Sequence, residues 1–528
     1  MLTFSDFALH RNLQKAVNDM GFEEPSPIQA TAIPLILEGH DVIGQAQTGT
    51  GKTAAFGIPL IERVSNEGKV QAIVLTPTRE LAIQVSGELR KISKYKRTRT
   101  LPIYGGQSIG HQIRTLKQGV QVVIGTPGRI LDHLRRKTLR LDDVKMVVLD
   151  EADEMLDMGF IDDIKEILSY TPEERQTLLF SATMPNEILD LSRRYMNNPE
   201  TVAINRKEVT APLIDQVYYK VLERNKLDSL CRILDSEEVG LGIVFCRTKR
   251  GVDELTDALQ ERGYLADGLH GDLSQAQRDR VMKGFRDSSI ELLVATDVAA
   301  RGIDVGNITH VINYDIPQDP ESYVHRIGRT GRAGRKGIAL TLVTPREMRQ
   351  LLTIEKVTKS NLQPRSVPTL AEVAEKQQMQ WKEQVISVIT SDDVDLSLFT
   401  SVVDDMKQEY SLERIAAAAL HVAFSSTFQT EEEEVYNFGD TGASKGMVRF
   451  FMNVGRNIEM KPHDLVKEIS ETVGISGKSV GKIDIFDKFT FFEITEDAAP
   501  FVYEALRHSR VLGARVNVEP AKPRGKRE

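Results

Sequence analysis

Short apolar runs alternate with longer amphipathic segments through the first two thirds of the chain. The clearest runs lie at 72–75, 120–124, 146–149, 242–246, 291–295 and 310–314. Runs this short and this apolar are typical of strands that are buried on both faces, as in a parallel sheet. Because helical segments separate the strands, the pattern predicts two α/β domains in tandem, each built on a parallel sheet.

Polar segments mark the expected boundaries of these two domains. The first is expected at 1–205 and the second at 216–366, with a polar linker at 206–215 between them. Apolar residues then recur at helical spacing, which predicts a small helical module at 367–425. The stripe that defines this module consists of Leu412, Ile415, Ala416, Ala419, Leu420 and Ala423.

The C-terminal part of the chain changes pattern twice more. Four consecutive glutamates followed by scattered glycines predict a solvated linker at 426–446. Residues 447–519 then alternate as strand, helix, strand, strand, helix and strand. This order predicts a split βαβ domain, and it is followed by a basic tail at 520–528.

Composition narrows the class of protein. Of the 528 residues, 41% are hydrophobic and 27% are charged, and only two are cysteines. This is ordinary for a globular protein, and so few cysteines exclude a disulfide framework and predict a cytoplasmic location. We expect neither a secretory signal nor a membrane span. The net charge of −8 argues against a uniformly basic nucleic-acid coat but leaves room for local basic grooves.

One loop has the composition of a phosphate-binding loop, formed by Ala46, Gln47, Thr48, Gly49, Thr50, Gly51, Lys52 and Thr53. Its glycines allow a tight turn that points amide hydrogens at phosphate oxygens. Lys52 would reach the β- and γ-phosphates, and the Thr53 hydroxyl would ligate Mg²⁺. The general pattern has glycine where this chain has Ala46, which weakens the general match.

Two carboxylates directly follow an apolar run. Asp150 and Glu151 stand at the carboxyl end of the predicted strand 146–149, where open α/β sheets bind ligands. Asp150 would hold Mg²⁺, and Glu151 would polarise the attacking water. Paired acids at a helix start also simply favour the helix dipole, so this assignment depends on the phosphate loop upstream.

Two arginines, Arg329 and Arg332, stand three residues apart between glycines. An isolated pair of this kind is usually a solvated basic turn. With a phosphate loop elsewhere in the chain, we expect arginine fingers that reach the γ-phosphate when the two domains close, an effect worth roughly 10³–10⁵ in rate. A polymer bound across both domains could then control hydrolysis by controlling closure.

These stretches together resemble the DEAD-box family of ATP-dependent RNA helicases, over about residues 1–360, and residues 447–519 resemble the RNA-binding domain of the bacterial cold-shock, DeaD-like type. Ala46, which departs from the general phosphate-loop pattern, is the residue that this family has at that position. The resemblance implies two tandem RecA-like lobes, then a small helical module and a C-terminal RRM-like α+β domain. It also implies ATP as substrate, Mg²⁺ as cofactor and RNA as partner.

Further residues are assigned to ATP by the same resemblance. Gln29 lies in a segment similar to the adenine-reading Q motif of the family, and Phe4 and Phe22 match aromatic positions of that region. Asp304 matches the acid that binds the ribose. The residues expected to link the ATP state to the RNA state are Asp153, Ser181, Thr183 and His325.

The resemblance also implies an RNA-binding surface on both lobes. The expected contacts are Pro77, Thr78, Arg79, Gly105, Gly106, Thr126, Gly128 and Arg129 in the first lobe, and Thr248, Gln277, Arg280 and Thr296 in the second. Such donors grip phosphate and sugar, so sequence preference should be weak. Contacts to the 2′-hydroxyl would favour RNA over DNA.

The last third resembles accessory domains of the same bacterial group. In 447–519, Phe489 and Phe491 keep the aromatic spacing of a general RNA motif but lack its basic and glycine positions, so they either stack on bases or belong to the core. From Lys445 onward, 15 Lys and Arg against 12 Asp and Glu give a local charge of +3. The helices of 367–425 resemble a dimerisation region, and the alternative is a bracket packed on the second lobe.

The expected function is ATP-dependent local unwinding of short RNA duplexes. Ribosome assembly, messenger-RNA decay and cold adaptation are the roles that the family implies, with ribosomal or RNA-decay complexes as partners. The alternative is an ATP-gated RNA clamp or scaffold that hydrolyses ATP but unwinds little. A DNA translocase is disfavoured because the sequence contains no recognisable element for strand separation or translocation.

Overall fold

The computed structural model describes residues 2–46, 50–203, 214–303, 305–332, 335–391, 395–424, 436–507 and 509–522. Two compact units form the chain, Met1–Val217 with Gly240–Leu340 and Tyr218–Val239 with Thr341–Glu528. The division passes through the second sheet, because strands β8 (Ile214–Lys220) and β13 (Gly337–Val343) cross it. The units therefore do not coincide with the domain boundaries expected from the sequence.

The first sheet has seven strands in the order β3-β4-β2-β5-β6-β1-β7. Its strand pairs are parallel, as predicted. Val74 and Val148 enter one apolar core and Ile73 and Val147 enter the other, so the strands are buried on both faces. The elements of this lobe are η1 Phe4–Asp6, α1 Arg11–Asp19, α2 Pro27–Glu38, β1 Val42–Gln45, α3 Lys52–Arg63, β2 Ala72–Leu75, α4 Arg79–Ile92, β3 Thr100–Ile103, α5 Ile109–Lys117, β4 Val122–Gly125, α6 Pro127–Arg135, β5 Met146–Asp150, α7 Ala152–Asp157, α8 Ile161–Ser169, β6 Gln176–Ser181, α9 Asn186–Tyr195 and β7 Glu200–Ala203.

A second seven-stranded sheet follows, in the order β10-β11-β9-β12-β13-β8-β14. The neighbours β10, β11, β9 and β12 pair in parallel. The strand order matches that of the first sheet in kind, so the prediction of two parallel-sheet lobes is confirmed. Besides β8 and β13, its elements are η2 Glu223–Asn225, α10 Lys226–Ser236, β9 Leu241–Phe245, α11 Lys249–Glu261, β10 Ala266–Leu269, α12 Gln275–Arg286, β11 Leu292–Ala295, α13 Asp297–Ala300, β12 Ile308–Asn313, α14 Pro320–Ile327, η3 Pro345–Glu347, α15 Met348–Thr358 and β14 Gln363–Arg365.

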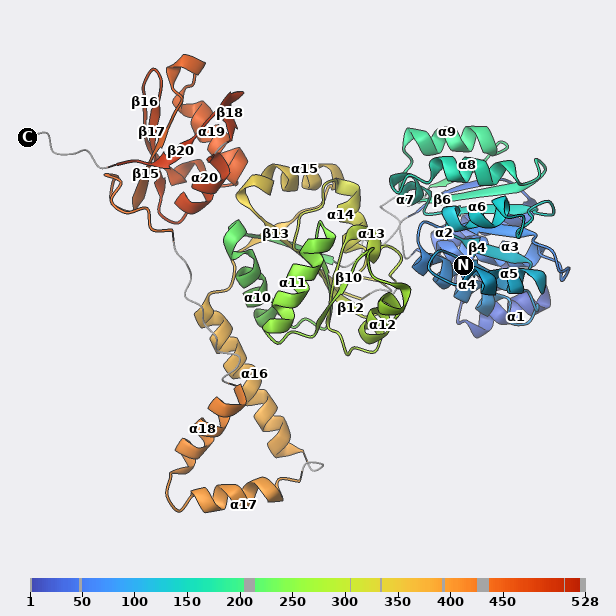
Figure 1. Ribbon diagram of the computed structural model, residues 1–528, viewed down its shortest axis with the longest axis horizontal. Coiled ribbons are helices and arrows are strands. Elements are labelled where there is room, and N and C mark those ends of the chain that lie inside the picture. The colour runs from blue at the N-terminus through green and yellow to red at the C-terminus, as the bar shows by residue number, and fades with distance from the viewer. Residues whose placement is uncertain are drawn as a thin grey trace, which may run out of the picture. The chain divides into compact units, whose positions relative to one another are not determined.

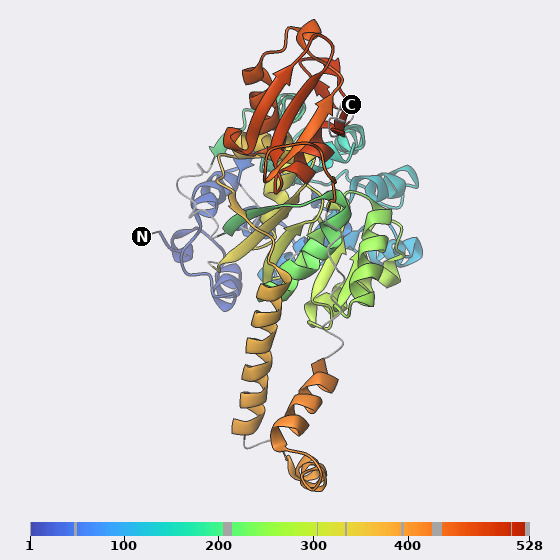
Figure 2. The same cartoon turned by 90° about the vertical axis from the view of Figure 1, so that its left-hand side faces the viewer.

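The helical module consists of α16 (Leu370–Thr390), α17 (Ser397–Met406) and α18 (Leu412–Phe424). The first turns of α16 pack on α10, where Val373 and Gln377 are buried and the Lys376 ammonium donates to the carbonyl of Ser236. Figure 2 shows α16 continuing beyond this contact as one unbroken helix. Many large apolar side chains of the module are exposed, among them Met379, Ile386, Ile389, Leu398, Phe399, Val402, Leu412, Leu420 and Val422.

The C-terminal domain is a four-stranded sheet in the order β16-β17-β15-β20, with antiparallel pairs. Helices α19 and α20 pack on one face (Figure 1), where Leu465, Ile469 and Val502 complete an apolar core. The split βαβ prediction is therefore confirmed. The elements are β15 Met447–Met452, η5 Arg456–Ile458, α19 Pro462–Val473, η6 Gly477–Ser479, β16 Val480–Ile485, β17 Thr490–Thr495, α20 Ala499–Leu506, β18 Arg510–Val511, β19 Ala514–Arg515 and β20 Val518–Pro520.

The described end of the expected linker packs on this domain. Tyr436 and Phe438 stack on each other, and Phe438 contacts the rings of Phe450 and Tyr503. The Thr441 hydroxyl is buried and accepts a hydrogen bond from the amide of Arg449. Residues 436–446 thus differ from the solvated linker that their glycines predicted, because their aromatic rings supply apolar surface to the domain. The glutamate run lies outside the described residues.

Candidate nucleotide and RNA site

The carboxyl ends of three adjacent strands gather the expected ATP residues. Strands β5, β6 and β1 are neighbours in the first sheet, with Asp150 opposite Phe180 and Gln45 opposite Ser181. The phosphate loop leaves the end of β1, and the acidic run leaves the end of β5. Because parallel strands end at one edge, chain segments more than a hundred residues apart meet there, as predicted.

The phosphate loop is held from the side by the segment that contains Gln29. The Ser26 hydroxyl donates to the carbonyl of Thr50 at 2.8 Å, and the Gln29 side-chain amide donates to the carbonyl of Gly51 at 3.1 Å. Gly51 has a φ of +89°, and a Cβ there would lie 2.3 Å from Gln29 Nε2. Glycine is therefore required at this position for both conformation and space. Gln47, Thr48 and Gly49 lie outside the described residues.

Lys52 opens α3 with a buried ammonium group. Its exposed fraction is 7%, and its Nζ has no hydrogen-bond acceptor among the described residues. A buried ammonium group without a hydrogen-bond acceptor is costly, so the position suits an anionic ligand. The start of a helix adds amide hydrogens and a favourable dipole. This arrangement fits the β- and γ-phosphates of ATP, with Thr53 half-buried beside it.

Asp150 and Glu151 are also buried, with exposed fractions of 2% and 8%. Burial raises the pKa of Asp150 to about 7, against the opposing charge of Lys52 and with a contribution from Glu151. Glu151 has a φ of 51° and a ψ of 56°, a left-handed conformation that a non-glycine residue adopts at a cost. The Asp150 carboxylate accepts the Glu151 amide at 3.1 Å.

The donor set fits Mg²⁺. Mg²⁺ is usually held by one or two carboxylates together with substrate phosphates and water, rather than by an all-protein cage. Within the described ranges, no cluster of three or more His, Cys, Asp or Glu side chains could form such a cage. Asp150, whose carboxyl group interacts with the Lys52 charge, and the Thr53 hydroxyl are the oxygen donors here that fit such an ion.

Asp153 connects the acidic run to the segment after β6. Its Oδ2 accepts the amides of Ala182 and Thr183 at 3.0 and 2.8 Å and the Thr183 hydroxyl at 3.1 Å. The Asp153 amide donates to the Ser181 hydroxyl at 3.2 Å. The structure thus places three of the expected coupling residues, Asp153, Ser181 and Thr183, in one network, with four hydrogen bonds that fix the segment 181–183 against α7.

His325 contacts the acidic run through Glu154, a residue that the sequence reading did not single out. Glu154 is buried, and its carboxylate pairs with both the His325 imidazole and the Arg301 guanidinium. Burial alone would lower the pKa of His325, but the hydrogen bond and charge of Glu154 outweigh burial and raise that pKa. Glu154 is therefore the acid that joins the two lobes at this point, one residue beyond the expected Asp153 region.

The two candidate arginine fingers lie at the end of α14 and just beyond it. Arg329 is buried and donates to the carbonyls of His325 and Ile303 at 3.2 and 3.3 Å. Arg332 donates to the carbonyl of Gly328 at 2.9 Å. The neighbouring Arg326 has a different role, because both its Nε and Nη2 donate to the Asp297 carboxylate inside the lobe. Asp304 lies outside the described residues.

The aromatic residues of the expected adenine region pack on one another. Phe4 is buried and stacks on Phe22 with ring centroids 5.4 Å apart, and it also meets Phe7 edge to face. Gln29 is buried as well, and its Oε1 accepts the amide of Ser26 at 2.9 Å. Phe4 is therefore a core residue beneath the expected adenine region, and the half-buried ring of Phe22 stacks on it.

Three further strands of the same sheet, β2, β3 and β4, lead into the expected RNA contacts. Thr78 follows β2 and caps α4, the pair Gly105 and Gly106 follows β3, and Thr126 precedes α6 after β4. A Cβ on Gly106 would lie 2.5 Å from the Arg79 guanidinium, so glycine lets that side chain pass close to the backbone. Pro77 is buried beside Thr78, while Gly128 is exposed.

A buried polar network fixes Arg129 in this surface. Arg129 donates to the carbonyl of Gln107 at 3.2 Å and to Gln112 Oε1 at 3.4 Å. Gln112 also donates to the carbonyl of Tyr104 at 3.1 Å and contacts His133 Nε2 at 2.9 Å. Gln112 and His133 are fully buried. The network ties the glycine loop to α6, and the sequence reading missed both residues because each lies on an amphipathic helix.

In the second lobe, two neighbours of the expected RNA residues contact the first lobe. Gln277 and Arg280 are exposed on α12. Instead, Gln275 accepts from Arg79 at 2.6 Å, and Arg278 donates to Glu80 at 2.6 Å. Thr248 and Thr296 stand at the N-caps of α11 and α13.

Phe489 and Phe491 lie outside the core of the C-terminal domain. The core contains Phe450 and Phe492 instead. Phe489 and Phe491 form a cluster with Phe451 and Phe486 on the opposite side of the sheet, with ring centroids 4.7 to 6.4 Å apart. We call these four rings the aromatic face. The Arg449 guanidinium lies 4.5 Å from the centre of the Phe491 ring.

Four family models match this chain. They are "DEAD/DEAH box helicase" over residues 26–191, "Helicase conserved C-terminal domain" over 225–334, "RNA helicase DeaD dimerization domain" over 368–434 and "DbpA RNA binding domain" over 449–520. Among the described residues, no helix is both long and apolar enough to cross a membrane. The matches agree in order with the two sheets, the helical module and the C-terminal sheet.

Curated relatives share most of the chain. A DEAD-box ATP-dependent RNA helicase CshA of Geobacillus kaustophilus (strain HTA426) is 57% identical over 421 residues, or 80% of this chain and 90% of the relative. The protein of the same name from Bacillus subtilis (strain 168) is 55% identical over 423 residues, or 80% and 85%. The solved structure of S. cerevisiae Dbp5 bound to RNA and ADP BeF3 is similar with a TM-score of 0.65 at 34% identity, over 71% of this chain and 99% of that chain.

Proposed function

This chain belongs to the DEAD-box family of ATP-dependent RNA helicases, and from that premise we propose that it separates short RNA duplexes locally. In this proposal ATP and RNA close the two lobes, and closure bends one strand away from its partner. Hydrolysis then reopens the lobes and releases the strand. The cycle couples ATP to strand separation without movement along the duplex.

The observation that carries the proposal is the division of one sheet edge into two halves. Strands β5, β6 and β1 end in the buried ATP residues, and strands β3, β4 and β2 end in the expected RNA residues. Because β2 and β5 are neighbours, both substrates would lie against one rigid edge. A second lobe that closes on this edge can therefore respond to both.

Each ATP residue has a distinct role in the proposed chemistry. The Lys52 ammonium would neutralise the β- and γ-phosphate oxygens, and Glu151 would orient the attacking water and accept its proton. Mg²⁺, held by Asp150 and Thr53 when bound, would supply positive charge to the same oxygens. Arg329 and Arg332 would stabilise the charge that develops on the transferred phosphoryl group in the closed state.

The C-terminal domain would serve as an accessory RNA anchor. The aromatic face offers flat rings for unpaired bases, and Arg449 adds a guanidinium beside Phe491. Base stacking on such rings depends little on sequence. We propose that this anchor holds structured RNA near the lobes in ribosome assembly, messenger-RNA decay or cold adaptation, in the cytoplasm and in ribosomal or RNA-decay complexes.

The helical module would join two copies of the chain. Its large apolar side chains, such as Ile389, Leu398 and Phe399, are exposed in a single copy, and exposed apolar surface is typical of protein interaction sites. A second copy would cover it. Light scattering at micromolar concentration should give the mass of a dimer for the unmutated chain, and deletion of 378–424 should give a monomer.

A strand-displacement assay separates the proposed helicase from an ATP-gated RNA clamp, since the two share every ATP residue. Short and long RNA duplexes are incubated with the protein and ATP, and released strand is measured beside released phosphate. We expect efficient release from the short duplex and little from the long one. Phosphate release without strand release from either duplex would favour the clamp.

A further inference from the structure

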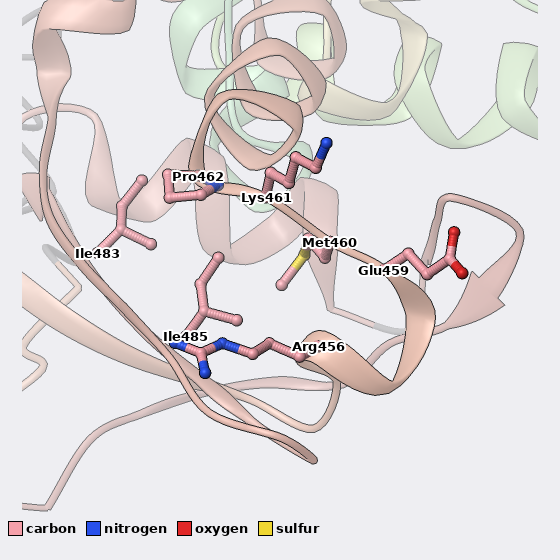
Figure 3. Close-up of a pocket in the computed structure, with 7 residues that line it drawn as sticks. All are labelled: Arg456, Glu459, Met460, Lys461, Pro462, Ile483 and Ile485. Carbon is pink, nitrogen blue, oxygen red and sulfur yellow. The ribbon is translucent and has the colours of Figure 1, made fainter.

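The strongest remaining feature is a hollow in the C-terminal domain, on the side of β16 away from the aromatic face. Its volume is about 570 Å³, within the roughly 300–1,000 Å³ range of small-ligand sites. It lies between the edge strand β16 and the start of α19. Figure 3 shows the side chains that line it.

The floor of the hollow is apolar. Met460, Pro462, Ile483 and Ile485 line it, and Met460 is buried while both isoleucines are half-buried. Ile483 and Ile485 alternate along β16 with Asp484, which pairs with Arg449 on the other face. The alternation of the strand therefore gives this edge two different surfaces, one aromatic and one aliphatic.

Cationic groups stand at the rim. Arg456 and Lys461 line the hollow, and neither side chain forms an ion pair with another described residue. In Figure 3 the Arg456 guanidinium reaches toward Ile485, whereas the Glu459 carboxylate extends away from both isoleucines. Glu459 has a φ of 58°, and this left-handed turn separates its side chain from that of the buried Met460.

The loop that presents Arg456 is fixed to the hairpin of the aromatic face. The Arg456 amide donates to the carbonyl of Phe486 at 2.9 Å, and the Asn457 amide donates to that of Asp487 at 2.9 Å. A Cβ on Gly455 would lie 2.0 Å from the Phe486 carbonyl oxygen, so only glycine allows this approach. The loop that forms one wall of the hollow is thus fixed by backbone hydrogen bonds to the hairpin that carries the exposed Phe486.

We propose that this hollow binds a single unpaired nucleotide of a structured RNA, with the base against the aliphatic floor and a flanking phosphate on Arg456. The inference rests on the proposed RNA anchor and adds a second site to it. An apolar floor matches the flat face of a base, and a guanidinium matches a phosphate in charge and geometry. RNA that binds the aromatic face would reach the hollow by passing around the edge strand β16 at the Phe486 hairpin.

Two blunt-ended RNA duplexes of one sequence test the proposal, one fully paired and one with a single bulged nucleotide. Affinity for the full-length protein is measured without ATP by fluorescence anisotropy at several salt concentrations. The unmutated protein should prefer the bulged duplex. Arg456→Ala should weaken binding to the bulged duplex about tenfold and reduce the salt slope by about 1. Ile485→Ala should weaken it roughly threefold to tenfold without changing that slope.

Two controls separate this site from the anchor as a whole. Lys467→Ala removes an exposed cation of α19 that does not line the hollow, and it should leave the preference unchanged. Thermal unfolding of each variant checks that the domain still folds. Because Arg456 is exposed, we expect Arg456→Ala to fold normally. If both Arg456→Ala and Ile485→Ala keep the full preference for the bulged duplex, the hollow is not an RNA site. It would then suit another ligand, such as an acidic peptide. If Phe491→Ala also leaves all binding unchanged, the anchor itself is wrong.

Discussion

The expected ATP residues lie at the carboxyl ends of β5, β6 and β1, which we call the ATP edge of the first sheet. The ATP edge and the aromatic face of the C-terminal sheet differ in how far their functional side chains are exposed. At the ATP edge, Lys52, Asp150 and Glu151 are all at most 8% exposed. On the aromatic face, Phe486 is 42% exposed and the other three rings are half-buried. Reaction chemistry needs charges that are oriented before the substrate arrives and shielded from water. Stacking needs only a surface that a base can reach.

The difference predicts how each region responds to change. A substitution at the ATP edge should alter the rate far more than it alters binding. A substitution on the aromatic face should alter RNA affinity without touching hydrolysis. On β17 the core residue Phe492 stands next to Phe491 and provides a matched control, and exposed residues away from the ATP edge provide controls for that region.

Loss of an arginine finger should give the largest effect. Arg329→Ala and Arg332→Ala should each lower RNA-stimulated hydrolysis by roughly 10³–10⁵, while ATP affinity in the open state falls much less. Steady-state phosphate release and equilibrium binding of a fluorescent ATP analogue measure the two quantities. Arg286→Ala, an exposed arginine at the end of α12, is the control. Equal losses in rate and in ATP affinity would indicate a plain binding role.

Glu151→Gln should come next, with a rate lower by about 10²–10⁴. Glutamine keeps the shape of the side chain but cannot accept the proton from water, so ATP and RNA should stay bound in a long-lived complex. The dissociation rate of labelled RNA in the presence of ATP is the measurement. The exposed Glu174→Gln should behave as the unmutated protein does. If Glu151→Gln hydrolyses ATP at the normal rate, a group other than Glu151 activates the attacking water.

Adjacent phenylalanines on β17 sharpen the comparison within one strand. Phe491→Ala should cost about 1–3 kcal/mol of RNA binding and little stability, because its ring lies on the aromatic face. Phe492→Ala should cost about 3–5 kcal/mol of stability, because its ring is in the core. Denaturant unfolding and RNA titration separate the two. Similar unfolding costs at both positions would place Phe491 in the core after all.

The smallest effect should come from pH at His325. Its pKa is raised by Glu154, so the protonated pair contributes stability that is fully present below the ordinary histidine pKa near 6.5. That contribution should disappear as the pH rises through the raised pKa of the folded protein. The melting temperature of the unmutated protein and of His325→Gln should therefore differ most at low pH and converge at high pH. A gap that widens with rising pH would contradict the assignment.

The sequence predicted the ATP edge well because its residues are consecutive. Lys52 with Thr53 and Asp150 with Glu151 follow apolar strands, and a parallel sheet has only one edge where such strands end. The contact of Glu154 with Arg301 and His325 was not predictable, since it joins three distant segments. Gln112 and His133 look like surface residues on amphipathic helices, and only the fold shows that they face inward.

Residue spacing alone does not determine which side chains of α12 contact the first lobe or which face of β17 meets the helices. Packing in the structure determines both. Gln275 with Arg278 and Gln277 with Arg280 have the same spacing, but the turn of α12 directs the first pair toward Arg79 and Glu80. Along β17, alternation predicts two faces without saying which one meets the helices. The helices cover Phe492 because Phe450, its partner on β15, belongs to the same core.

RNA-stimulated ATP hydrolysis tests the central claim most directly, namely that one sheet edge serves both substrates. Phosphate release is measured with ATP and with GTP, with and without RNA, for the unmutated protein and for Lys52→Ala. The account predicts hydrolysis that depends on RNA, prefers ATP and disappears in Lys52→Ala. Hydrolysis that is equally fast without RNA, or that survives the loss of the Lys52 ammonium, would contradict it.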